Sequence, residues 1–234
     1  RRLSDISEAI RLSDIPEGNI GLCVIRQNTD GRLQLLVYGK VITGHVDPIE
    51  KKPVTHYMPG SKIFSIATTG CNWLCSYCQN SDISQRRKVE GTDLTPDEIA
   101  RMAVSYGCQG LAYTYNQPTI FIEFARDVGL EARRNGLINI FVSNGYDTPE
   151  TVGMMDDFLD CITVDFKGNA ETGFMRKYVG VPDAQPIFQT ITEIRDRTRI
   201  HTEITDADGS FGFLIKFHNS AKVAVIGHRY SFHA

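Results

Sequence analysis

The chain has 234 residues, of which 41% are hydrophobic, and a formal net charge of −3 at pH 7. Such a chain can bury a sizeable core, so we expect one domain with an appendage. The small charge predicts no binding surface for nucleic acid or anionic membranes, and we expect neither a membrane span nor a signal peptide. Six cysteines, three of them clustered, argue against a disulfide framework and favour a cytoplasmic protein.

The first sixty residues differ in pattern from those that follow. Two strand-like segments, residues 23–27 and 32–38, flank the turn-forming run Asn28-Thr-Asp-Gly31, which predicts a β-hairpin. Residues 45–53 contain two prolines and are expected to form an irregular connector. We therefore assign residues 1–60 to an N-terminal hairpin and connector, residues 61–206 to the main domain, and residues 207–234 to an atypical tail.

From residue 62 onward, strand and helix patterns alternate, which predicts an α/β fold with a parallel sheet or barrel. One helix has a complete start signal, with Thr95 as N-cap, Pro96 in the first turn and Glu98 closing a capping box. Strands are predicted at residues 62–67, 110–115, 139–143, 161–166 and 199–204, with further candidates at 211–217 and 223–226. Helices are predicted at residues 95–106, 119–134, from 148 onward, 171–178 and 186–197.

Polar residues stand at the carboxyl ends of several predicted strands. Because strand side chains alternate, Thr163, Asp165 and Lys167 share one face, while the other face of that strand is apolar. Barrel enzymes place their chemistry at the carboxyl ends of strands. Residues 70–78, 116–117, 144 and 165–167 should therefore converge there. His201 shares a face with Glu203 and has two readings, a site residue or a hydrogen-bonded core histidine.

The most informative feature is the run Cys71-Asn-Trp-Leu-Cys75-Ser-Tyr-Cys78, on a loop that follows the predicted strand 62–67. A four-iron cluster normally takes one thiolate per iron, so three cysteines leave one iron with an open position. A zinc knuckle or a disulfide pair are the alternatives. Zinc sites usually use two CxxC-type pairs or cysteine with histidine, and no second pair or nearby histidine follows.

The spacing resembles the CxxxCxxC signature of the radical S-adenosylmethionine (SAM) enzymes, including an aromatic residue, Tyr77, before the last cysteine. Residues 45–206 also resemble the radical SAM protein of the AmmeMemoRadiSam system, which is related to the activating enzymes of pyruvate formate-lyase-like proteins. The matching pieces begin at His45, Ala112, Val142 and Val164 and read HVDPIEKKP, AYTYNQPT, VSNGY and VDFKG.

The resemblance implies a partial (β/α)6 TIM-type barrel in which Cys71, Cys75 and Cys78 hold a [4Fe-4S] cluster and SAM binds the unique iron. Tyr77 would pack near the adenine, and the segment containing Asn116 and Gln117 would meet the methionine amino end. Contacts to the ribose or the methionine carboxylate would come from Asn144, Asp165 and Lys167. The alternative for Asp165 and Lys167 is an internal ion pair.

The family chemistry is reductive cleavage of SAM to a 5′-deoxyadenosyl radical, which takes a hydrogen atom from a substrate that the sequence does not specify. The implied partners are an electron donor such as flavodoxin or ferredoxin, and MEMO-like and AMMECR-like proteins. Two alternatives stay open, a glycyl-radical-enzyme activase and a non-catalytic iron–sulfur protein with a lost SAM site. The second is motivated by Gln117, where relatives typically carry glutamate, and by the atypical tail.

Overall fold

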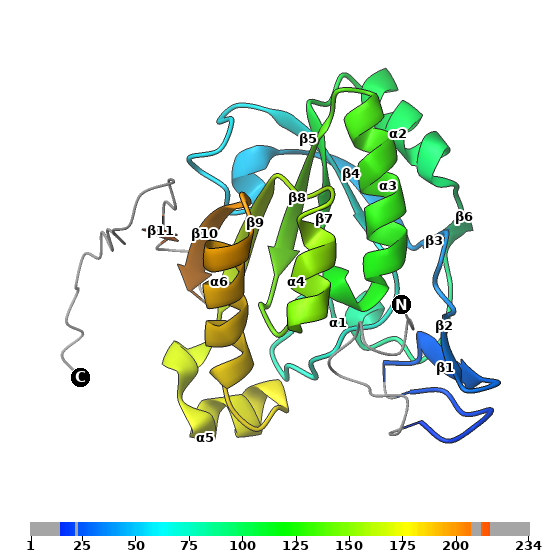
Figure 1. Cartoon of the computed structure of the whole chain (residues 1–234), viewed down its shortest axis with the longest axis vertical. Helices are drawn as coiled ribbons and strands as arrows, with labels where there is room; N and C mark the ends of the chain where they lie inside the picture. The colour runs from blue at the N-terminus through cyan, green and yellow to red at the C-terminus, as the bar shows by residue number, and fades with distance from the viewer. Residues whose placement is uncertain (1–14, 22, 207–211, 216–234) are drawn as a thin grey trace.

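The fold is built on a seven-stranded sheet, seen in a computed structural model that describes residues 15–21, 23–206 and 212–215. The strand order is β11-β10-β9-β8-β7-β5-β4 (Figure 1). The strands β5, β7, β8, β9 and β10 are parallel, and antiparallel strands flank them on both edges. The bounds are β4 (Thr43–Pro48), β5 (Lys62–Ala67), β7 (Gly110–Tyr113), β8 (Ile138–Ser143), β9 (Cys161–Phe166), β10 (His201–Asp206) and β11 (Gly212–Ile215). Among the described strands β4 and β11 do not pair with each other, so the barrel is open and partial.

Helices cover one face of this sheet (Figure 1). They are α2 (Pro96–Ser105), α3 (Ile122–Arg134), α4 (Pro149–Met155) and α6 (Gln185–Arg197), with the 3₁₀ turn η4 (Pro118–Phe121) leading into α3. The predicted capping box is confirmed, since Thr95 caps α2 and the Thr95 N–H donates to Glu98 at 2.8 Å. Three short helical turns lie after β9, namely η5 (Gly168–Ala170), α5 (Thr172–Phe174) and η6 (Met175–Val179), and α1 (Ser81–Ser84) follows β5.

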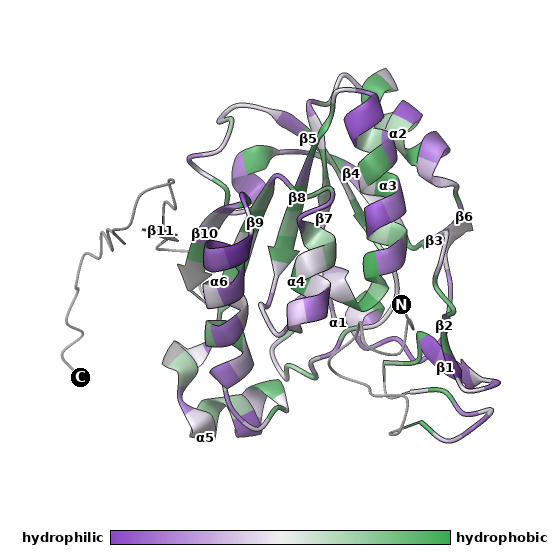
Figure 2. Cartoon of the chain, viewed as in Figure 1, coloured by the Kyte–Doolittle hydropathy of each residue, from purple (hydrophilic) through white to green (hydrophobic). Residues whose placement is uncertain are grey.

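The alternation predicted for residues 161–166 is confirmed. Ile162 and Val164 are fully buried in the large core between sheet and helices. Cys161 lies in a second apolar cluster on the inner face of the barrel, where Thr163 is also buried. Figure 2 shows hydrophobic residues along the strands and both hydrophilic and hydrophobic residues on the helices in front of them. The inner face of β9 is therefore apolar at its start, at Cys161, and polar towards its carboxyl end, at Thr163 and Asp165.

The predicted N-terminal hairpin is also confirmed, as β1 (Arg26–Thr29) and β2 (Arg32–Leu35). Its turn residues, Asp30 and Gly31, both have positive φ angles, 53° and 67°, as a tight hairpin turn requires. Arg26 joins the hairpin to α3. Its side chain is 1% exposed, and the guanidinium donates to both carboxylate oxygens of Glu123, at 2.8 and 2.6 Å. The hairpin is therefore fixed to the main body.

The prediction of an irregular connector at residues 45–53 was wrong. This segment forms β4, which pairs with β5 over its whole length, and the 3₁₀ turn η3 (Ile49–Lys51). Pro48 does not prevent pairing because it ends the strand at the edge of the sheet, where proline is tolerated. The described residues also include a small strand pair, β3 (Lys40–Val41) with β6 (Thr92–Asp93).

Two further points compare the predicted strands with the observed ones. The strand predicted at 110–115 ends at Tyr113, and Tyr115 adopts a left-handed φ of 71°. Of the two strand candidates in the tail, the first corresponds to β11, and residues 223–226 lie outside the described residues.

Within the described part of the chain, no helix is both long and apolar enough to cross a membrane.

Candidate cofactor site at the carboxyl ends of the strands

The cysteine loop, which we define as residues 70–80, follows β5 at the carboxyl end of the first parallel strand. Gly70, which precedes Cys71, has a φ of 94°. A Cβ at this position would lie 2.8 Å from the Cys23 carbonyl oxygen and 2.8 Å from a methyl group of Ile25. Only glycine fits both the backbone angle and this close approach. The N-terminal hairpin region thus packs against the start of the cysteine loop.

Backbone hydrogen bonds hold the middle of the loop against η6. The Leu74 N–H donates to the Val179 carbonyl at 3.0 Å, and the Ser76 N–H donates to the Tyr178 carbonyl at 2.9 Å. On the other side, the Gln85 amide donates to the Cys75 carbonyl at 2.9 Å. The loop has no regular secondary structure of its own, but η6 and Gln85 hold it in place by these hydrogen bonds.

The three thiols of this loop are free and partly buried. Burial, together with the nearby thiolates of Cys71 and Cys78, raises the pKa of Cys75 to about 11. Charges on Cys71 and Cys78 thus act electrostatically on the Cys75 thiol. The Cys78 Sγ lies 3.1 Å from the Ser84 Oγ. Among the described residues, no three Cys, His, Asp or Glu side chains are gathered into a metal-holding group, so the cluster ligands stay a prediction.

The turn after β7 brings Asn116 to the start of the loop. The Asn116 Nδ2 donates to the Gly70 carbonyl at 2.8 Å and to the Thr68 Oγ1 at 3.2 Å. Its Oδ1 is buried and accepts no hydrogen bond within the described residues. An unsatisfied buried acceptor is costly, so this oxygen is suited to a donor from a bound molecule.

Gln117 is turned away from the loop and into a buried polar network. Its Nε2 donates to Thr119 and Ser143 at 2.7 and 2.8 Å and lies 3.2 Å from the Asp147 Oδ1, while its Oε1 accepts from the Asn144 N–H at 2.7 Å. Burial raises the pKa of the Asp147 carboxyl to about 6. Asp147 was not among the residues predicted from the sequence. The only available signal was an acidic residue just after the strand at 139–143.

Asn144 connects the end of β8 to the cysteine loop. Its Nδ2 donates to the Asn72 Oδ1 at 2.8 Å, and its Oδ1 accepts from the Tyr146 N–H at 3.0 Å. Asn72 follows Cys71 directly. Asn116 and Asn144 therefore both lie at the cysteine loop, as the convergence of strand ends predicted, whereas the side chain of Gln117 does not.

Asp165 and Lys167 form an ion pair of 3.1 Å at the end of β9, and both side chains are partly exposed. Tyr77 is 43% exposed, and its ring centroid lies 5.9 Å from that of Phe174. These contacts agree with the internal ion pair that we considered for Asp165 and Lys167. They leave the cofactor role of all three residues a prediction.

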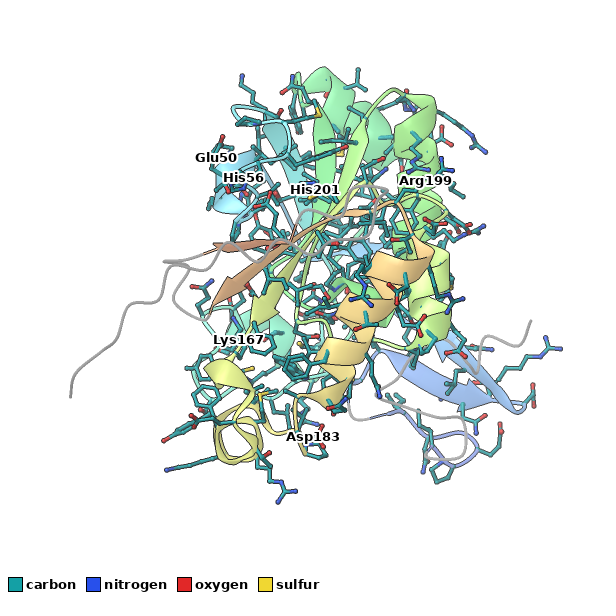
Figure 3. The ribbon with its side chains drawn as sticks, turned by 60° about the vertical axis from the view of Figure 1, so that its left-hand side comes forward. Glu50, His56, Lys167, Asp183, Arg199 and His201 are labelled. Atoms are coloured by element: carbon teal, nitrogen blue, oxygen red, sulfur yellow. The ribbon has the colours of Figure 1, made fainter. Side chains whose placement is uncertain are left out.

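His201 lies at the other end of the barrel from Lys167 (Figure 3). It begins β10, its Nε2 is 3.2 Å from the Glu203 Oε1, and its ring is 5.2 Å from that of Tyr57. Glu203 also accepts hydrogen bonds from the backbone N–H groups of Thr55 and His56, at 3.1 and 3.0 Å. His201 thus has the contacts of a hydrogen-bonded histidine of the barrel wall.

Comparison with known proteins decides the family. The model of the radical SAM superfamily matches residues 65–206, which include the cysteine loop and the parallel strands. The chain belongs to the radical SAM superfamily. A curated relative, the uncharacterized protein MJ0808 of Methanocaldococcus jannaschii, is 38% identical to this radical SAM chain over 194 residues, which are 82% of this chain and 56% of the relative. The chain thus spans little more than half the length of that protein.

Two solved structures are also similar to this radical SAM chain. One is TYW1 with a lysine-pyruvate adduct bound, with 14% identity, a TM-score of 0.42 and coverage of 62% of this chain and 54% of the other. The second is QueE from Escherichia coli, with 10% identity, a TM-score of 0.41 and coverage of 72% of this chain and 83% of the other.

In residue type and spacing, the three cysteines match the cluster that the radical SAM superfamily implies, although their side chains are not gathered into a metal-holding group within the described residues. Three free thiols share one loop, and the thiolates of Cys71 and Cys78 disfavour ionisation of Cys75. A bound cationic iron centre would relieve this repulsion and favour the thiolate forms. The Asn116 Oδ1, which has no hydrogen-bond partner among the described residues, adds an acceptor beside the loop that an ammonium or amide group could satisfy.

Proposed function

We propose that this chain is the core of a radical SAM enzyme that binds a [4Fe-4S] cluster through Cys71, Cys75 and Cys78 and cleaves SAM reductively. The observation that supports this most is the position of three free thiols on the loop after β5, inside the region that matches the superfamily. The bound cluster would supply one electron to the sulfonium of SAM, which gives methionine and a 5′-deoxyadenosyl radical that abstracts hydrogen from a substrate.

The chain's own residues would position SAM and keep water away from it. Asn116 and Asn144 lie at the cysteine loop, and the free acceptor of Asn116 suits the ammonium group of the methionine part. Lys167 carries a positive charge at the end of β9, and we assign it, with Asp165, to the carboxylate and the ribose of SAM. The partly exposed ring of Tyr77 offers an apolar surface for the adenine.

Gln117 has a different role in this proposal. Its hydrogen bonds to Ser143, Thr119 and the Asn144 N–H hold the ends of β7 and β8 together. The contribution of Gln117 to SAM binding is then indirect, through the position of the neighbouring Asn116 and Asn144.

The test is anaerobic reconstitution with iron and sulfide, reduction with dithionite, addition of SAM and detection of 5′-deoxyadenosine by chromatography. We expect product from the wild-type chain and none from Cys75→Ala. Cys108→Ala is the matched control because Cys108 is a free, buried cysteine outside the loop, and this variant should keep activity. A cluster that forms without SAM cleavage would contradict the proposal and favour a non-catalytic iron–sulfur protein.

The proposed partners rest on the chemistry of SAM cleavage and on the resemblance to the AmmeMemoRadiSam system. We propose an electron donor of the flavodoxin or ferredoxin type, a cytoplasmic location where thiols stay reduced, and MEMO-like and AMMECR-like proteins as associates. In a glycyl-radical activase the hydrogen donor would be a glycine of a partner protein. Mixing the active chain with such a partner and finding no protein-based radical by electron paramagnetic resonance would exclude this assignment for that partner.

A further inference from the structure

A polar cluster outside the site described above consists of the buried Asp47 and Lys52 and the partly buried Tyr115. The Asp47 Oδ2 accepts hydrogen bonds from the Lys52 Nζ at 2.6 Å and from the Tyr115 hydroxyl at 2.7 Å. The Lys52 side chain is 2% exposed, and its Nζ lies 4.7 Å from the centroid of the Tyr115 ring. Lys51 binds the other oxygen of Asp47 at 2.7 Å but is 62% exposed.

Such a cluster is weak evidence for stability. Taking a lysine and an aspartate out of water carries a desolvation penalty that can cancel their attraction, whereas the pair can fix one particular geometry. Burial lowers the pKa of Lys52, and the hydrogen bond to Asp47 opposes this shift. The cluster holds the side chain of Tyr115 in place, because Asp47 accepts a hydrogen bond from its hydroxyl and the Lys52 Nζ lies over its ring.

Tyr115 has a backbone conformation that needs such support. Its φ of 71° is in the left-handed region, which is unfavourable for a residue with a bulky side chain. Strained residues persist only where the surrounding structure holds them, and they cluster at functional sites. The Tyr115 ring also has His45 at an edge-to-face distance of 6.2 Å.

The backbone turn at Tyr115 and Asn116 holds both ends of the cysteine loop. Asn80 lies two residues after Cys78, and its Nδ2 donates to the Tyr115 carbonyl at 3.0 Å. The Asn116 Nδ2 donates to the carbonyl of Gly70, the residue before Cys71, at 2.8 Å. Rotation of this turn would shift both contacts together, because the two residues are neighbours in the chain.

We propose that the Asp47–Lys52 ion pair is a positioning device for the cysteine loop and acts through Tyr115. This proposal depends on the proposed function only because the loop that the ion pair positions is the one that would hold the cluster. Neither Asp47 nor Lys52 is a catalytic residue. Both come from β4 and the turn after it, the segment that the sequence alone predicted to be an irregular connector.

The test compares Lys52→Met with Lys51→Met in the full chain, before and after anaerobic reconstitution. The substitution is the same, and both lysines contact Asp47, but only Lys52 contacts Tyr115. Amide hydrogen exchange is followed in residues 70–80 and, for reference, in α2. We expect Lys52→Met to speed exchange in residues 70–80 by roughly tenfold, which corresponds to the loss of a charged hydrogen bond. Exchange in α2 should change less than twofold, and Lys51→Met should leave both regions unchanged.

Tyr115→Phe is a milder second variant, because it removes the hydroxyl and keeps the ring. It should also speed exchange in residues 70–80, and in reconstituted protein it should broaden the electron paramagnetic resonance spectrum of the reduced cluster. Unchanged exchange in both Lys52→Met and Tyr115→Phe would overturn the proposal, as would an equal increase in α2. Exchange needs no SAM cleavage. If the exchange effects occur but the wild type makes no 5′-deoxyadenosine, the proposed function fails and the positioning device stands.

Discussion

Gln117→Glu separates two roles for this position, a direct contact to SAM and a structural contact to Asp147. The Gln117 Nε2 lies 3.2 Å from the Asp147 Oδ1, and both side chains are buried. A charged carboxylate at the amide position would repel Asp147 by roughly 5 kcal/mol at an effective dielectric constant of about 20. The structural role therefore predicts that the substitution destabilises the fold.

The introduced carboxyl can avoid this repulsion by holding a proton. A glutamate has a pKa of about 4.3 in the unfolded chain, and holding its proton costs about 5 kcal/mol at pH 8 but only about 2 kcal/mol at pH 6. Burial and Asp147 raise the pKa of the introduced carboxyl in the folded state, so the folded state binds protons more tightly than the unfolded state. Stability is then present at low pH and is lost as the pH rises.

Urea unfolding followed by circular dichroism at pH 6 and pH 8 measures this effect. We expect Gln117→Glu to lower the free energy of unfolding by several kcal/mol at pH 8, with a loss roughly 3 kcal/mol smaller at pH 6. Gln189→Glu is the matched control. Gln189 is exposed on α6, and its substitution should stay within about 0.5 kcal/mol of the wild type at both pH values. If Gln117→Glu keeps wild-type stability at pH 8 and tightens SAM binding, the reasoning is refuted and Gln117 faces the cofactor.

Three further predictions concern the cysteines and the core. The triple change of Cys71, Cys75 and Cys78 to Ala should abolish bound iron and sulfide after reconstitution, whereas undiminished iron would reject these ligands. Glu123→Gln leaves the buried Arg26 without its counter-charge and should cost about 3–5 kcal/mol in urea unfolding, and a loss below about 1 kcal/mol would contradict a buried ion pair. Gly129→Ala places a Cβ 2.1 Å from the Phe158 ring and should cost about 1–3 kcal/mol. At Gly153, outside its own helix backbone and its chain neighbours, no atom of the described residues lies within 4 Å of the new Cβ, so Gly153→Ala should be neutral or stabilising. Equal effects of the two substitutions would exclude the packing argument.

The sequence predicted the elements whose signals are local. The capping box at Thr95 located α2, and the alternation in residues 161–166 gave the bounds and both faces of β9. The cysteine spacing and the strand before it placed the cysteine loop at the carboxyl end of β5. These features depend on residues close together in the chain, so a single sequence contains them.

Features that depend on distant contacts were missed. Residues 45–53 look irregular because of their prolines and charges. In the structure, β4 pairs with the later strand β5, and Lys52 neutralises Asp47. The left-handed turn at Tyr115 has no local signal such as glycine. Likewise the sequence places Gln117 at a strand end, but the hydrogen bonds that turn its side chain towards Ser143 come from another strand.

The most direct test of the account is to quantify methionine and 5′-deoxyadenosine together after SAM is added to the reconstituted, dithionite-reduced chain. Reductive cleavage predicts equal amounts of the two products, and their complete loss in Cys75→Ala. Methionine without 5′-deoxyadenosine, or both products at the wild-type level in Cys75→Ala, would contradict the assignment of this loop as the site of radical SAM chemistry.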